Sequence, residues 1–332
     1  MVLEAPFPYF GGKSKIADEV WRRFGDVPNY VEPFFGSGAV LLRRPAWHTG
    51  HIETVNDKDG YVSNFWRAVK HDPQKTAEYA DYPVIENDLH ARHYWLVQRK
   101  DELAAKLEGN HDWYDPKIAG WWAWGMSCWI GRGFCRGKGS WVSENGLMVK
   151  AGKGQGVNRQ LPHMSGSRGI NRQLPQLRNL GEGVNRPTQP LYEWFDRLSG
   201  RFKDVRVCCG DWSRIVTPSP TFVLGLTGIF LDPPYDDYES MYTTGGNAVS
   251  AEVRAWAIEA GKNPLMRIAL CGYDTEHPMP DDWAVYRWKS GGGYGNQGEG
   301  QGRENSKRET IWFSPSCLKH EQLSITAFTD LG

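Results

Sequence analysis

The chain alternates short continuous apolar runs with longer segments in which apolar residues recur at helical spacing. The short runs are typical of buried strands, and the periodic segments are typical of amphipathic helices. The pattern predicts strands within 52–57, 205–209, 222–231, 265–271, 283–288 and 308–313, and helices within 16–24, 61–70, 89–107, 191–198 and 251–260. With 332 residues, the chain is long enough for one large α/β domain with an insert, or for two domains.

The apolar run 222–231 leads directly into Asp232-Pro233-Pro234-Tyr235. A strand must end there, because proline has no N–H to donate to a sheet and its φ is fixed. In open α/β sheets this carboxyl edge is where ligands bind. Asp232 and the carbonyl of Pro233 can accept both hydrogens of one planar amino group, and Tyr235 can stack on the ring that carries it. The stretch therefore indicates methylation of an exocyclic amine on a flat heterocycle; a polar turn with an aromatic plug is the alternative.

A Gly-Gly turn in segment 8–13 is followed by Lys13. Such a turn lets the backbone approach a ligand, and Lys13 supplies a mobile cation for a carboxylate or a phosphate. An ordinary turn with a solvated lysine is the alternative.

Segment 29–42 predicts a strand, a glycine-rich turn and then a helix. Gly36 and Gly38 would let a ligand lie against the backbone at the start of that helix. The dinucleotide fingerprint is incomplete, because position 41 is Leu. Glu32 at the strand end would repel a phosphate and attract an ammonium, which favours a zwitterion joined to a nucleoside over a pyrophosphate. A purely structural turn is the alternative.

Two further acids stand at or just after the ends of predicted strands. Asp57 lies 21 residues after Gly36, where α/β folds commonly bind ribose hydroxyls; a cap for the helix 61–70 is a compatible alternative. Asp211 could accept a hydrogen bond from the amino group of a bound adenine, and Trp212 could pack on its ring. A plain strand–helix turn competes with that interpretation.

The tryptophans between 121 and 129 predict a core helix packed against the sheet. His90 and His93 are interpreted as surface or packing residues. The six cysteines have no Cys-x-x-Cys pair and no histidines at zinc spacing, which indicates buried reduced thiols and no metal. No signal peptide and no membrane segment are expected, and the expected location is the cytoplasm of a bacterial or phage-infected cell.

Charge is balanced over the chain, with 39 Lys and Arg and 39 Asp and Glu, but it is segregated within it. Residues 131–190 hold ten Lys and Arg against two acids, are rich in glycine, and repeat the motif of 157–162 at 170–175. Such a segment offers phosphate contacts and side chains that read base edges, whereas a solvated low-complexity loop is the alternative. The candidate DNA-binding residues are Arg132, Arg136, Lys138, Arg159, Arg168 and Arg172.

Five motifs in one order resemble the alpha-group, Dam-like adenine-specific DNA methyltransferases. They are Tyr9–Lys13, Val31–Gly38, Asn56–Asp57, Gly210–Trp212 and Asp232–Tyr235. The repeats and the glycine-rich stretch 291–302 depart from the short members of that family.

The resemblance implies an α/β, Rossmann-like catalytic domain over 1–130 and 191–332, using S-adenosylmethionine, with a DNA target-recognition insert over 131–190. Segment 130–150 weakly resembles the family's DNA-probing hairpin. The expected reaction is N6 methylation of a flipped adenine in double-stranded DNA, by a monomer or weak dimer. Cytosine-N4 methylation, or DNA binding without activity, are the alternatives. The implied catalytic residues are Asp232, Pro233, Pro234 and Tyr235, and the implied cofactor-binding residues are Tyr9, Lys13, Glu32, Phe34, Gly36, Gly38, Asp57, Asp211 and Trp212.

Overall fold

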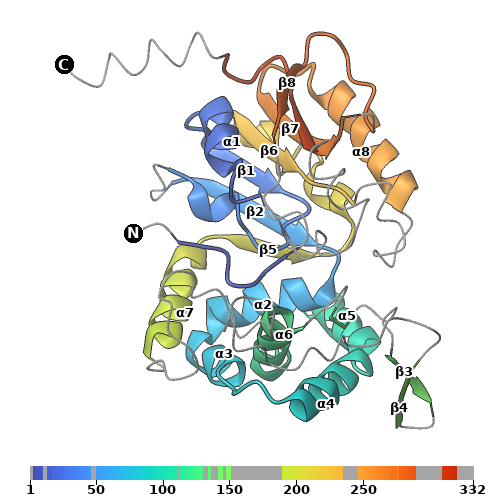
Figure 1. Ribbon diagram of the computed structural model, residues 1–332. Coiled ribbons are helices and arrows are strands. Elements are labelled where there is room, and N and C mark those ends of the chain that lie inside the picture. The colour runs from blue at the N-terminus through green and yellow to red at the C-terminus, as the bar shows by residue number, and fades with distance from the viewer. Residues whose placement is uncertain are drawn as a thin grey trace, which may run out of the picture. The chain divides into compact units, whose positions relative to one another are not determined.

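The computed structural model describes residues 3–9, 13–45, 50–110, 112–129, 134–135, 141–144, 147–150, 189–234, 246–274, 276–288 and 309–319. The chain divides into two compact units, and most of their helices and strands are labelled in Figure 1. The sheet unit comprises 1–4, 11–57 and 204–332, and the helical unit comprises 5–10 and 58–203.

The sheet unit contains a seven-stranded sheet in the order β5-β2-β1-β6-β7-β9-β8. Its strands are β1 (Asn29–Glu32), β2 (Ile52–Asp57), β5 (Arg206–Cys209), β6 (Thr227–Leu231), β7 (Met266–Tyr273), β8 (Ala284–Arg287) and β9 (Glu309–Phe313). Strands β5, β2, β1, β6 and β7 are mutually parallel, whereas β9 is antiparallel to both β7 and β8. The chain leaves β1 toward β2 on one side and returns to β6 on the other. The order therefore reverses at β1, and ligands in such sheets bind beside the carboxyl ends of the strands at this point.

Alternate residues of β6 face opposite sides of the sheet, and helices of the sheet unit cover both sides. Gly228 faces α1 (Ala17–Phe24): a Cβ at Gly228 would lie 2.9 Å from the Phe24 ring, so glycine permits this close packing. Its neighbour Ile229 is buried in an apolar cluster that includes Val253 of α8 (Gly246–Ala260). Burial on both faces explains why β6 is a continuous apolar run.

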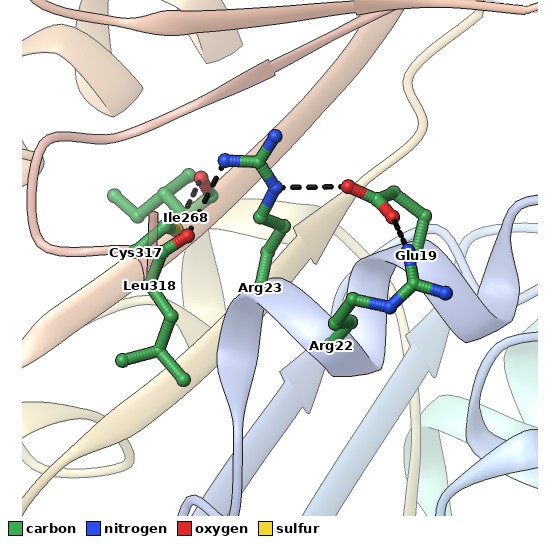
Figure 2. A network of polar contacts seen from close by, with 6 residues as sticks. All are labelled: Glu19, Arg22, Arg23, Ile268, Cys317 and Leu318. Carbon is green, nitrogen blue, oxygen red and sulfur yellow. Dashed lines mark hydrogen bonds and ion pairs between the residues drawn. The ribbon is translucent and has the colours of Figure 1, made fainter. Parts of the chain in front are cut away.

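The segment after β9 is bound to α1 and β7, as Figure 2 shows. The Leu318 N–H donates to the Arg23 carbonyl over 2.9 Å, and the Arg23 guanidinium donates to the Leu318 carbonyl over 3.3 Å. The Cys317 thiol contacts the Ile268 carbonyl at 3.5 Å, and Glu19 accepts from Arg23 at 2.9 Å and also from Arg22. These contacts hold the carboxyl end of β9 in place.

The helical unit is built from six helices and one hairpin among its described residues. They are α2 (Gly60–His71), α3 (Pro73–Ala80), α4 (Glu86–Val97), α5 (Lys100–Gly109), α6 (Pro116–Cys128) and α7 (Gln189–Phe202), with β3 (Trp141–Glu144) antiparallel to β4 (Leu147–Lys150). The hairpin falls in the segment that resembles the DNA-probing hairpin. Helix α6 packs against α2, α3 and α4. Its Trp122 and Trp124 are buried, so α6 is the central helix of this unit.

Four sequence-based expectations are corrected by the structure. The run 222–231 is not one strand: Phe222–Leu224 is the 3₁₀ helix η3, and Gly225 adopts φ 98° before β6 begins. The helix expected after Gly38 is a single 3₁₀ turn, η1 (Leu41–Arg43), because the residue before Pro45 disfavours helical backbone.

The segment 89–107 is divided between α4 and α5 rather than forming one helix. The tryptophan-rich helix was expected to pack against the sheet, but its neighbours are helices of its own unit. The apolar residues of this helix would look the same in the sequence whether it packed on a sheet or on other helices. Only the tertiary structure shows which of the two it contacts.

Candidate active site

The glycine-rich turn after β1 is bound to the end of β2. The Gly36 N–H donates to Asp57 Oδ2 over 2.8 Å, and the Phe35 N–H donates to the Asn56 carbonyl over 3.0 Å. Gly36 and Gly38 have φ values of 50° and 70°, a region that side chains with a Cβ rarely adopt. Asp57 is not the cap of α2, because Asp59 accepts from the Tyr61 N–H at 3.0 Å. The turn and the acid therefore form one local structure at the strand ends.

Asn56 joins three strand ends, and sequence analysis assigned it no role of its own. Its side-chain amide donates to the Pro33 carbonyl over 3.1 Å and to the Gly210 carbonyl over 3.0 Å. The Gly210 N–H in turn donates to the Asp57 carbonyl over 3.2 Å. The amide is buried, and its Oδ1 has no hydrogen-bond partner among the described residues. Its place one residue before the acid that ends β2 is the only signal that the sequence offers for it.

Aromatic rings line the region after β5. The rings of Phe34 and Trp212 stack with centroids 6.2 Å apart, and Trp256 packs edge-on against Trp212 at 6.0 Å. Asp211 caps η2 (Trp212–Ile215): its Oδ1 accepts from the N–H of Ser213 at 3.0 Å and from its hydroxyl at 2.6 Å. The strand–helix turn that was the alternative for Asp211 is thus present. That Asp211 also accepts a hydrogen bond from the amino group of a bound adenine stays a prediction.

Lys13 pairs with the acid that follows β6. Its ammonium lies 3.0 Å from Asp232 Oδ1 and 3.8 Å from Glu309 Oε2, and the Lys13 side chain is only 4% exposed. Burial alone would lower the pKa of Lys13, but the two carboxylates outweigh burial, and the pKa lies above its ordinary value. The alternative of a solvated lysine at this position is therefore wrong.

Glu32 is buried at the carboxyl end of β1 and accepts from the Tyr30 hydroxyl at 2.8 Å. Burial raises the pKa of Glu32 well above its ordinary value; the Tyr30 bond opposes this rise, whereas the charges of Asp232 and Asp57 add to it. Glu32 and Asp57 end β1 and β2, and Asp232 directly follows β6, so these three acids lie at the carboxyl ends of three adjacent parallel strands. An arriving ammonium would favour the ionised form of Glu32.

The structure brings most of the predicted site residues of the sheet unit to one sheet edge. Tyr9 belongs to the helical unit, where its ring packs edge-on against Phe7 at 6.1 Å. Pro233 is buried and Pro234 is half-buried, directly after β6. Tyr235 and the six candidate DNA-binding residues lie outside the described residues.

Two buried groups near Lys13 were missed by sequence analysis. Glu309 begins β9, and Cys271 belongs to β7; burial raises the pKa of the Cys271 thiol, so the thiol stays protonated. An acid at the start of an otherwise apolar strand is the only signal that the sequence offers for Glu309. Neither residue could be assigned without knowing that β9 lies next to β7.

The fold and the site together define a class of protein. The sheet is parallel with an antiparallel strand near one edge, a glycine-rich turn follows β1, an acid ends β2, and Asp-Pro-Pro follows β6. This combination is a Rossmann-like fold of the methyltransferase type. Residues 9–114 match the family described as D12 class N6 adenine-specific DNA methyltransferase. This match confirms the resemblance to the Dam-like adenine methyltransferases, and with it the predicted fold, enzyme class and reaction. No curated protein matches the chain.

The family's reaction requires a methyl donor and DNA. Within the described ranges, no group of three or more His, Cys, Asp or Glu side chains is arranged to hold a metal ion. None of the helices in those ranges has the length and apolar character needed to span a membrane.

Proposed function

We propose that the chain transfers a methyl group from S-adenosylmethionine to N6 of an adenine flipped out of double-stranded DNA, with Asp232 and the Pro233 carbonyl as hydrogen-bond acceptors for the amino group. The observation that carries this proposal is the position of Asp232. It directly follows β6, which is the neighbour of β1, and the strand order reverses at β1, the strand that the glycine-rich turn follows. Donor and base would thus meet at adjacent strand ends.

Features of the sheet unit fit the parts of S-adenosylmethionine. Gly36 and Gly38 have no Cβ, so backbone can approach the donor closely. Asp57 suits ribose hydroxyls, because a carboxylate that accepts one bond from Gly36 has further lone pairs for hydroxyl donors. The Phe34 and Trp212 rings suit stacking with the adenine of the donor. When bound, S-adenosylmethionine supplies an electrophilic methyl carbon on a sulfonium, whose carbon–sulfur bond breaks with both electrons remaining on sulfur.

The chain's own residues would orient the target nitrogen. Acceptance of both amino hydrogens by Asp232 and the Pro233 carbonyl turns the N6 lone pair out of conjugation with the ring. The methyl group replaces one amino hydrogen, which leaves as a proton, and the Asp232 carboxylate stabilises the positive charge that develops on nitrogen. The ion pair with Lys13, at 3.0 Å, would hold this carboxylate in position. Tyr235 would stack on the flipped base.

Base flipping is part of the proposal, because the amino group of a stacked and paired adenine is out of reach of the donor. We expect Arg132, Arg136, Lys138, Arg159, Arg168 and Arg172 to contact DNA and the segment 131–190 to act in target recognition. The excess of positive charge in that segment supports this role.

The test is incubation of the protein with methyl-labelled S-adenosylmethionine and duplex DNA, followed by nucleoside analysis. N6-methyladenine is the expected product. Formation of N4-methylcytosine would show that the target base is cytosine and not adenine. Bound but unmodified DNA would indicate a DNA-binding protein without activity. Comparing duplex with single-stranded DNA tests the duplex requirement.

A further inference from the structure

Glu309 lies at the active-site edge although it is far from the other site residues in sequence. In the pairing of β9 with β7, Glu309 is opposite Tyr273, at the carboxyl end of β7. Leu231, just before Asp232, is opposite Leu270 of the same strand. Because β9 runs antiparallel to β6 and β7, its first residue lies at the edge where their last residues lie.

The position of β9 is held from both ends. Its far end is bound to α1 through Leu318 and Arg23 (Figure 2). At its near end, the Glu309 carbonyl accepts from the Trp288 N–H at 3.1 Å. The Glu309 carboxylate is therefore presented by a rigid strand, which is the kind of element that holds a charge accurately.

Among the described residues, two carboxylates flank one ammonium in this cluster. Asp232 is 3.0 Å and Glu309 is 3.8 Å from Lys13 Nζ, and the Lys13 and Glu309 side chains are 4% and 8% exposed. Charges at such depth interact more strongly than at the surface. The formal charges of Lys13 and Asp232 cancel, and the Glu309 carboxylate adds one further formal negative charge beside this pair.

We propose that Glu309 is a positioning residue for methyl transfer: it shares the Lys13 ammonium with Asp232, so that the Asp232 carboxylate keeps negative charge available for the amino group that is being methylated. This inference rests on the proposed role of Asp232. Positive charge grows on N6 only as the new bond forms, so a nearby excess of negative charge stabilises the transition state more than the bound substrates.

A merely structural role for Glu309 has a different consequence. If the carboxylate only satisfied a buried lysine, its removal would lower the stability of the fold, but the folded fraction would methylate DNA at the normal rate. The single-turnover rate of folded enzyme therefore separates the two roles, whereas a stability measurement alone would not.

The test is the single-turnover rate of methyl transfer in Glu309→Gln, with donor and DNA saturating. We expect the rate to fall by about tenfold or more, with little change in donor affinity, because the lost interaction acts in the transition state. Glu309→Asp keeps the charge and should recover the rate to within about threefold of wild type. Folded Glu309→Gln with a wild-type rate, or Glu309→Asp as slow as Glu309→Gln, would overturn the inference.

Glu53→Gln is the matched control. Glu53 is also a buried acid of the sheet unit, paired with Arg44 at 2.9 Å, and its loss should change stability without changing the rate. If Glu309→Gln does not fold, Glu309→Asp alone tests the inference. Its rate should stay within about threefold of wild type, and a larger loss in folded protein would overturn the inference.

The wild-type product distinguishes failure of this inference from failure of the proposed function. If wild-type enzyme makes no N6-methyladenine, the role proposed for Asp232 fails first, and the inference falls with it. If wild-type enzyme makes N6-methyladenine and Glu309→Gln makes it equally fast, the proposed function stands and only the role of Glu309 is wrong.

Discussion

The Gly36 N–H donates to the Asp57 carboxylate over 2.8 Å, which connects the turn after β1 to the last residue of β2. The bond lies within the sheet unit and involves no ligand. The turn is thus pre-shaped by the strand next to it, and a donor would bind without first ordering this part of the site. Asp57 consequently has two functions to test, one toward the backbone and one toward the donor.

Asp57→Ala should weaken the binding of S-adenosylmethionine by about 10- to 100-fold, because it removes both the bond to Gly36 and the expected acceptor for ribose hydroxyls. Calorimetric titration measures the affinity. Asp59→Ala is the control: it removes the cap of α2 and should lower stability by about 1 kcal/mol without changing donor affinity. Equal donor affinities in wild type and Asp57→Ala would remove Asp57 from the cofactor site.

Asp232→Asn should lower the rate of methyl transfer by at least about 10²-fold while donor binding persists. The substitution conserves shape but offers one acceptor oxygen and an amide that donates, so the amino group of adenine and the Lys13 ammonium lose a charged partner. Single-turnover kinetics measure the rate, and donor titration shows whether the variant is folded. A rate close to that of wild type would exclude Asp232 as the catalytic acceptor.

Acid should destabilise the sheet unit through His277. Burial lowers the pKa of His277 to about 4, from an ordinary value of 6.5, although the bond to the Cys271 carbonyl opposes the shift. The unfolded chain therefore binds a proton more readily, so the stabilisation is present above pH 6.5 and is lost as the pH falls toward 4. From pH 7 to pH 5 we expect the free energy of unfolding to fall by about 2 kcal/mol from this residue.

Urea unfolding of wild type and His277→Gln at both pH values measures that contribution. The variant is expected to be less stable at pH 7, because a buried ring is lost, but to show a smaller change between the two pH values. His93, in the helical unit, also has a pKa lowered by burial to about 4, so a residual pH dependence should remain in the variant. An unchanged difference between pH 7 and pH 5 would contradict the assignment to His277.

Neutralising Arg159, Arg168 and Arg172 together should flatten the salt dependence of DNA binding. Each phosphate contact contributes about 0.9 to the slope of log affinity against log salt concentration, so the slope should fall by up to about 3. A control variant neutralises the exposed Arg22, Lys262 and Lys319 of the sheet unit. If both variants give the wild-type slope, the basic segment is a solvated loop rather than a DNA-binding one.

The strand ends were predictable because local chemistry determines them. Pro233 cannot continue a ladder after β6, and glycines at 36 and 38 indicate a turn after β1, where the structure has positive φ at both. The extent of β6 was predicted less well: an apolar run does not reveal that Phe222–Leu224 forms a 3₁₀ helix with exposed Val223 and Leu224. A run of apolar residues reports the type of side chain and not its exposure. A partly exposed turn can therefore have the same pattern as a buried strand.

By itself, the sequence determined the order of the motifs, the family to which they point and the acids that end the strands, because these depend on residue type and on neighbours along the chain. Only the tertiary structure decided that Lys13 pairs with Asp232, that Glu309 shares that ammonium, and that Asn56 joins three strand ends. These contacts depend on the order and direction of strands in the sheet. Strand order is set by packing over the whole unit, and no local pattern encodes it.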